Sequence, residues 1–126
     1  MENLYINGTQ HTPEVSFDEN GVLLLRGRSI PENSLAFFQE LYTWIENYGL
    51  NPNPSTEMII QLDYFNTSSS KCILDLMKRL ETISENGHKV FVKWYYDEDD
   101  EDMLESGEDY QDLIELNFEF IVLEEE

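Results

Sequence analysis

The chain has 126 residues, 40% of them hydrophobic, which suits one compact domain over residues 1–126 and leaves no room for two ordinary ones. The formal net charge is −20, with 27 acidic and 7 basic residues. Nucleic acid and anionic membrane surfaces need dense lysine and arginine, so both are excluded as favourable partners. The single cysteine cannot form an internal disulfide, and no apolar run approaches the roughly 20 residues that cross a bilayer. No signal peptide is visible at the N-terminus, so we expect a cytoplasmic protein.

The N-terminal part of the chain predicts strands. Residues 4–6 favour a short strand, and residues 14–17 and 21–27 favour a hairpin. Asn20-Gly21 is a good turn for this hairpin because both residues tolerate positive φ. Residues 22–25 are apolar at every position, which predicts a strand that is partly covered on both faces.

A helix and a central strand follow. Asn33 or Ser34 can cap a helix over residues 35–48, whose apolar residues recur with helical spacing, and Gly49 is a natural stop. Residues 57–65 form a largely apolar run, which predicts a buried strand.

The second half of the chain continues the alternation of strands and helices. Residues 67–85 predict the clearest helix, with one apolar face and a stop at Asn86-Gly87. Residues 88–96 and 118–123 predict strands, since they are rich in aromatic and β-branched side chains. Residues 103–114 predict a weaker helix interrupted by Gly107, and the acidic residues 124–126 are expected to fray. This order predicts a single α/β domain with a mixed or parallel β-sheet and helices packed against it.

The turn from residue 66 to 71 is the strongest functional candidate. Four consecutive hydroxyl residues, Thr67, Ser68, Ser69 and Ser70, stand where a buried strand ends and a helix begins. A helix start exposes unpaired N–H groups and the positive end of the dipole, so it favours an anion. The hydroxyls therefore serve either as helix caps together with Asn66, or as a phosphoacceptor whose phosphate could also pair with Lys71.

Three other groups of residues each have an ordinary structural explanation and a possible functional one. Residues 97–102 are all acidic, which suits a solvated helix start and leaves docking on a basic partner surface open. Trp94 and Tyr96 share one face of their strand and Tyr95 takes the other, so one of the two tyrosines could anchor a partner beside Thr67. His11, His88 and Cys72 are too scattered for a metal site or a catalytic dyad, and Cys72 suits a core position. We expect no catalytic residue, no metal and no cofactor.

Several motifs together resemble the SiaC family of regulatory phosphoproteins, whose fold is similar to that of STAS domains of the anti-anti-sigma type. The Asn-Thr-Ser-Ser block after an apolar strand, with Trp-Tyr-Tyr-Asp downstream, is the most specific part. The matching residues cover most of the chain; they are Gly8-Thr9-Gln10, Thr12-Pro13, Pro31-Glu32-Asn33-Ser34, Tyr64-Phe65-Asn66-Thr67-Ser68-Ser69 and Val92-Lys93-Trp94-Tyr95-Tyr96-Asp97.

The resemblance implies a partner switch. It implies that Thr67 is phosphorylated by a kinase resembling anti-sigma-factor kinases and dephosphorylated by a PP2C-type phosphatase. The hydroxyl run itself leaves Ser68, Ser69 or Ser70 open as the alternative acceptor. It further implies that the unmodified form binds a target such as a diguanylate cyclase. Apart from the resemblance, the aromatic side chains of Tyr64, Tyr95 and Tyr96 make them possible partner-binding residues. Two other functions stay open: a constitutive interaction or assembly domain, and a carboxylate-dependent enzyme, although no spaced pair of acids stands out.

Overall fold

The structure, a computed structural model, describes residues 1–123, so the predicted fraying of residues 124–126 lies outside the described part. The elements follow one another as β1 (Leu4–Ile6), β2 (Glu14–Phe17), β3 (Val22–Ser29), α1 (Ser34–Tyr48), β4 (Ser55–Phe65), α2 (Thr67–Glu85), β5 (Lys89–Asp97), α3 (Glu101–Leu113) and β6 (Asn117–Leu123). Each predicted strand and helix is therefore present, and Asn33 is the cap of α1.

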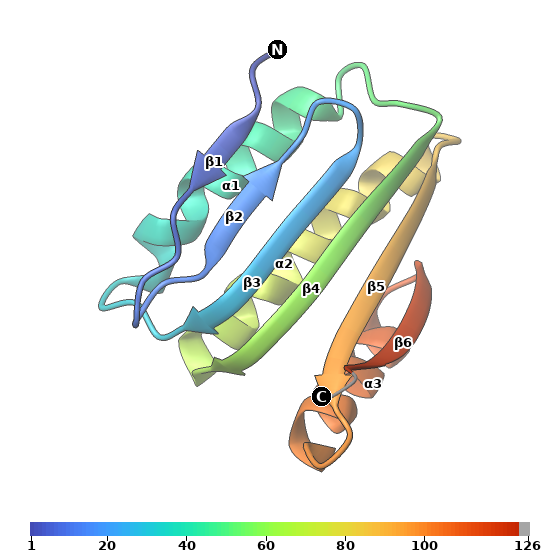
Figure 1. Ribbon diagram of the computed structural model, residues 1–126. Helices are drawn as coiled ribbons and strands as arrows, with labels where there is room; N and C mark the ends of the chain where they lie inside the picture. The colour runs from blue at the N-terminus through green and yellow to red at the C-terminus, as the bar shows by residue number, and fades with distance from the viewer. Residues whose placement is uncertain (124–126) are drawn as a thin grey trace.

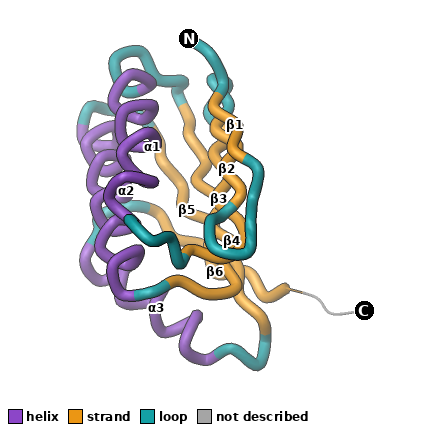
Figure 2. Tube along the Cα trace, turned by 90° about the vertical axis from the view of Figure 1, so that its left-hand side faces the viewer, coloured by secondary structure: helices purple, strands orange, loops and turns teal. Residues whose placement is uncertain are grey.

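The strands form one mixed sheet in the order β1-β2-β3-β4-β5-β6 (Figure 1). The pairs β1–β2 and β2–β3 are antiparallel, whereas β3–β4, β4–β5 and β5–β6 are parallel. Each parallel step is a crossover through one helix, and such crossovers are almost always right-handed. Because every step moves to the next strand in the same direction, α1, α2 and α3 all lie on one face of the sheet (Figure 2). This confirms the predicted mixed sheet with helices packed against it.

The hydrophobic core lies between that face and the helices. In β4 the buried residues alternate as Thr56, Met58, Ile60 and Leu62. In β3 the buried apolar residues are Leu23 and Leu25, and Ser29 is buried at the end of the strand, while Val22 is 45% exposed on the opposite face. None of the helices in residues 1–123 covers this outer face of the sheet (Figure 2), where Leu24 is half-buried and Val22 is exposed, so the predicted partial cover of both faces holds only in part. The common direction of the crossovers is the physical reason.

Helix α3 runs through Gly107 without a break, although the sequence predicts an interruption there. A Cβ atom at Gly107 would lie 2.7 Å from side-chain atoms of both Trp94 and Phe120, closer than such contacts occur. The glycine therefore lets the helix backbone approach the sheet closely. The Trp94 indole Nε1 also donates a hydrogen bond of 2.9 Å to the Met103 carbonyl and so anchors the first turn of α3.

Membrane-spanning helices were searched for over residues 1–123, and none of the helices there has the length and hydropathy to cross a bilayer.

Candidate functional site

The turn between β4 and α2 lies at the edge where β3 and β4 end, at the lower left of Figure 1. One backbone hydrogen bond joins this turn to the end of β3, and a second joins the end of β3 to the loop between β1 and β2. The Asn66 N–H donates to the Ser29 carbonyl at 3.1 Å, and the Ile30 N–H donates to the His11 carbonyl at 2.8 Å. The end of β3 and the loop between β1 and β2 therefore lie beside the turn, so the site contains three segments that are distant in sequence.

Asn66 is the N-cap of α2. Its side-chain Oδ1 accepts the Ser69 N–H at 2.9 Å and the Ser68 hydroxyl at 3.1 Å. Its backbone is extended, with φ −85° and ψ 176°, as an N-cap requires. The cap role predicted for this turn is thus carried by Asn66, and Thr67 is the first residue of the helix itself.

The four hydroxyl residues of the turn occupy different environments. Thr67 is exposed, and its side chain makes no hydrogen bond within residues 1–123. The Ser68 hydroxyl contacts the Ser34 hydroxyl at 2.7 Å. Ser69 is completely buried and accepts the Ser29 hydroxyl at 2.8 Å. The Ser70 carbonyl accepts the Tyr110 hydroxyl at 2.8 Å.

Ser29, Ser34, Ser68 and Ser69 form a connected group, here called the serine cluster. Ser29 ends β3, Ser34 begins α1, and the other two lie in the first turn of α2. Ser29 and Ser34 are buried, and the sequence analysis did not identify either as part of the site. Their contacts span 34 to 40 residues of sequence, so no local pattern could have indicated them.

Tyr110 is another residue that the sequence analysis missed. It comes from α3 and reaches the first turn of α2 through its hydrogen bond to the Ser70 carbonyl. Burial raises the pKa of Tyr110 to about 12, so the phenol stays protonated and remains a donor at physiological pH. Together with the serine cluster, Tyr110 holds the turn from the side of α3.

Within α2 itself, the electrostatics of the first turn favour an anion. The first turn of α2 contains no acidic residue, whereas the first turn of α3 contains Glu101 and Asp102. The positive end of the α3 dipole is thus already matched by carboxylates, and that of α2 is not. Lys71 is exposed one turn into α2 and adds a positive charge near the same end. A phosphate on an exposed hydroxyl here would meet free N–H groups and a cation.

The aromatic residues of the predicted partner surface differ in exposure. Tyr64 is 53% exposed and directly precedes the turn. Trp94 is completely buried against the helices, and its ring packs 5.5 Å from that of Tyr110, between centroids. Tyr95 and Tyr96 are both half-buried. Of the three tyrosines predicted to bind a partner, Tyr64 is the one that is exposed, and it lies beside Thr67.

The remaining sequence candidates take structural positions. Asp100 caps α3, with its Oδ1 accepting the Met103 N–H at 3.0 Å, so the acidic run forms a helix start as predicted. Cys72 is buried in the core, as predicted, and its carbonyl accepts the Tyr42 hydroxyl at 2.9 Å.

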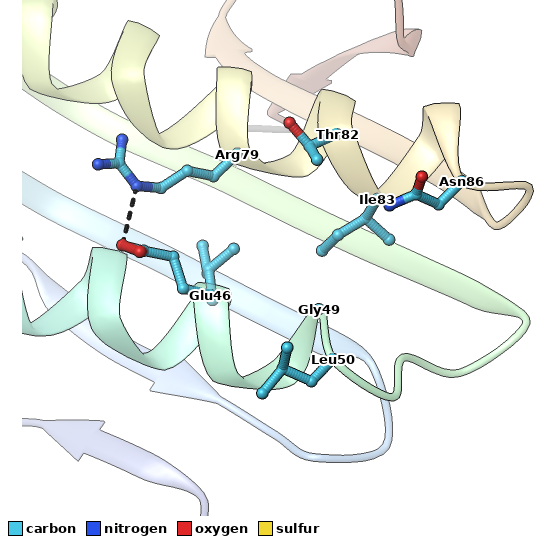
Figure 3. Close-up of a pocket in the computed structure, with 8 residues that line it drawn as sticks. Glu46, Gly49, Leu50, Arg79, Thr82, Ile83 and Asn86 are labelled. Carbon is cyan, nitrogen blue, oxygen red and sulfur yellow. Dashed lines mark hydrogen bonds and ion pairs between the residues drawn. The ribbon is translucent and has the colours of Figure 1, made fainter.

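A separate hollow of about 470 Å³ lies between the C-terminal ends of α1 and α2 (Figure 3). The Arg79 side chain extends toward Glu46 across this groove, with 3.4 Å between Nε and Oε1, and its guanidinium lies 4.0 Å over the Tyr42 ring. The charge of this arginine is therefore already matched. The hollow is at the opposite end of α2 from Thr67, so it is not part of the turn.

Comparisons with known proteins agree across nearly the whole chain. Residues 6–123 match the model of a family described as SiaC family regulatory phosphoprotein. An uncharacterized protein of Pseudomonas aeruginosa (strain UCBPP-PA14) is 33% identical over 123 residues, which are 97% of this chain and 96% of that protein.

Solved structures give the same result. The crystal structure of apo-SiaC from Pseudomonas aeruginosa matches with a TM-score of 0.90 and 32% identity, covering 97% of this chain and 100% of that one. A chain in the crystal structure of the diguanylate cyclase SiaD in complex with its activator SiaC, from the same organism, matches with a TM-score of 0.89 and 32% identity. That match covers 95% of this chain and 99% of the other.

Proposed function

Because the chain belongs to the SiaC family of regulatory phosphoproteins, we propose that it is a non-enzymatic switch protein whose binding to a diguanylate cyclase is controlled by phosphorylation of Thr67. In this proposal the protein works in the cytoplasm, within cyclic di-GMP signalling. A kinase of the anti-sigma-factor type adds the phosphate and a PP2C-type phosphatase removes it. The similarity to SiaC, which is an activator of SiaD in the related crystal structure, supports the choice of target.

The observation that carries the proposal is the difference among the four hydroxyls. Thr67 is exposed at the start of α2 and free of hydrogen bonds within the described residues, so a kinase can reach it without unfolding the turn. Ser69 is completely buried, and the Ser68 hydroxyl is bonded to Ser34 and Asn66. The absence of acids from the first turn of α2 makes the position favourable for a phosphate.

The control of binding is electrostatic. A neutral threonine hydroxyl can be buried against a partner at little cost. Its phosphate carries about 1.5 to 2 negative charges at neutral pH, and burying it without a cation costs several kcal/mol. Since each 1.4 kcal/mol changes affinity about tenfold, one phosphate is enough to release the partner.

The test compares Thr67→Ala and Thr67→Asp with the wild-type protein. We expect Thr67→Ala to bind the diguanylate cyclase of the same cells as the unmodified wild type does, and Thr67→Asp to bind at least about tenfold more weakly, because a charge then lies in the interface. Binding is measured by titration calorimetry with purified proteins. Phosphopeptide mass spectrometry on protein from its own cells identifies the modified residue.

Thr43→Asp is the matched control, since Thr43 is an exposed threonine on α1 and the substitution adds the same charge elsewhere. It should leave affinity within about twofold. Equal affinities for wild type and Thr67→Asp, together with no phosphate on residues 67–70, would instead favour a constitutive interaction domain.

A further inference from the structure

Arg28 differs from the other arginines in the described part of the chain. Arg26 pairs with Glu14 at 2.6 Å and Arg79 pairs with Glu46 at 3.4 Å. Arg28 is exposed and forms no ion pair within residues 1–123. In a chain of net charge −20, with 27 carboxylate side chains, an unmatched guanidinium stands out. It is a group that binds a carboxylate through two parallel hydrogen bonds.

The backbone around Arg28 departs from regular pairing. The β3–β4 register advances from Gly27↔Leu62 to Arg28↔Tyr64, which leaves Asp63 without a counterpart. Gly27 has a φ of +113°, in the left-handed region that favours glycine. Bulges are rare in parallel pairs and frequent next to functional sites, where they redirect a side chain. We therefore interpret the bulge as the feature that sets the direction of the Arg28 side chain.

A hollow of about 390 Å³ adjoins the arginine, lined by Gln10, His11, Arg28 and Ile30; it is called here the Arg28 hollow. None of the lining residues is acidic, and Gln10 and His11 can contribute further hydrogen-bond donors. The loop that supplies them is held in place by a contact of 2.8 Å between the Thr9 and Thr12 hydroxyls. The His11 carbonyl also accepts the Ile30 N–H at 2.8 Å. The backbone of the loop beside the hollow is thus held in place, and the side chains of Gln10, His11 and Arg28 are exposed on it.

The Arg28 hollow lies beside the phosphorylation turn. Arg28 pairs in register with Tyr64, three residues before Thr67, and the next residue, Ser29, accepts the Asn66 N–H. With strands about 4.8 Å apart and a rise of about 3.3 Å per residue, the backbones of Arg28 and Thr67 are separated by roughly 11 Å. That is slightly more than the Debye length of about 8 Å at physiological salt, so a charge at one position acts on the other weakly there and more strongly at low salt.

We propose that the Arg28 hollow receives an acidic side chain of the protein partner. The proposal rests on the proposed function, and it explains why phosphorylation weakens partner binding rather than strengthening it. Before phosphorylation, Arg28 attracts the partner's carboxylate in a molecule that otherwise repels it. After phosphorylation, the dianion on Thr67 offsets the charge of Arg28 and repels the same carboxylate.

The first experiment needs no cyclase. The labelled full chain is titrated at low salt with the terminally blocked peptide Gly-Glu-Ser-Glu-Gly, and amide shifts are followed by NMR. We expect saturable shifts confined to residues 9–12, 28–30 and 64–67, with at least tenfold weaker binding for Arg28→Gln. Arg26→Gln is the matched control, since Arg26 is an exposed arginine on the same strand two residues earlier, and it should bind within twofold of wild type. Shifts absent from these segments, or equal affinities for Arg28→Gln and wild type, would overturn the proposal.

The second experiment separates the hollow from the switch. Binding of the diguanylate cyclase is measured for Arg28→Gln, Arg26→Gln and Thr67→Asp at two salt concentrations. We expect Arg28→Gln to lose at least tenfold in affinity and to show a weaker dependence on salt. If Arg28→Gln loses affinity but Thr67→Asp does not, the Arg28 hollow is supported as a partner site and control by phosphorylation of Thr67 is overturned. If Thr67→Asp loses affinity but Arg28→Gln does not, phosphocontrol stands and the hollow fails as a partner site.

Discussion

At the scale of single residues, burial separates hydroxyls that are chemically almost identical. Ser69 is fully enclosed with Ser29, while Thr67, two residues earlier, faces solvent. A buried hydroxyl must keep its hydrogen bonds, because leaving a buried partner unsatisfied costs about 1 to 3 kcal/mol. Ser69 is therefore a stability residue, and Thr67 is available for modification.

Ser69→Ala should lower the free energy of unfolding by about 1 to 3 kcal/mol, because the buried Ser29 hydroxyl then loses the acceptor that it meets at 2.8 Å. Thr67→Ala is the control and should change stability by no more than about 0.5 kcal/mol, as exposed substitutions usually do. Urea denaturation followed by tryptophan fluorescence measures both. Equal losses for the two variants would mean that the serine cluster does not hold the turn.

At the scale of the elements, the helices are defined by their ends and by single close contacts. Asn33, Asn66 and Asp100 cap α1, α2 and α3, each by accepting an N–H group from the first turn. The caps are visible in the sequence as polar residues before apolar periodicity. The role of Gly107 cannot be predicted from the local sequence, because it depends on Trp94 and Phe120, which belong to β5 and β6.

Gly107→Ala should destabilise the protein by about 1 to 3 kcal/mol, even though alanine is the better helix former. The added Cβ would lie 2.7 Å from the rings of Trp94 and Phe120, so α3 must move away from the sheet. Ser106→Ala, at the preceding residue of the same helix, is the control and should be neutral or slightly stabilising. The unfolding midpoint and the Trp94 fluorescence report the change. A stabilised Gly107→Ala variant would show that α3 tolerates the shift without cost.

At the scale of the whole molecule, charge is the dominant feature. The net charge is −20, and three ion pairs are present in residues 1–123: Arg26–Glu14, Arg79–Glu46 and Lys93–Glu57. Such partly exposed pairs contribute little, whereas the remaining carboxylates repel one another in the compact state. This self-repulsion is relieved when the chain unfolds and expands.

Raising sodium chloride from about 10 mM to about 500 mM should therefore raise the melting temperature, by several degrees for a gain of about 1 kcal/mol, because salt screens the repulsion. Scanning calorimetry at pH 7 measures the effect. Potassium chloride at equal ionic strength should give the same gain, since screening depends on ionic strength. A melting temperature that falls with salt would mean that the ion pairs outweigh the repulsion.

The sequence by itself determined the succession of strands and helices along the chain, a sheet with helices packed against it and the hydroxyl-lined start of α2. These features depend on local periodicity, on capping residues and on turn residues such as Asn20-Gly21, all of which act within a few positions of the chain. The resemblance in residues 64–69 and 92–97 pointed to the family that the comparisons then showed.

Only the tertiary structure decided which face of the sheet is bare, which hydroxyls are buried, and why Gly107 occupies its position. It also brought Ser29, Ser34 and Tyr110 to the first turn of α2, and Arg28 to the same edge of the sheet. The physical reason is that these properties depend on contacts between residues tens of positions apart. Such contacts exist only after the crossovers have placed all three helices on one face.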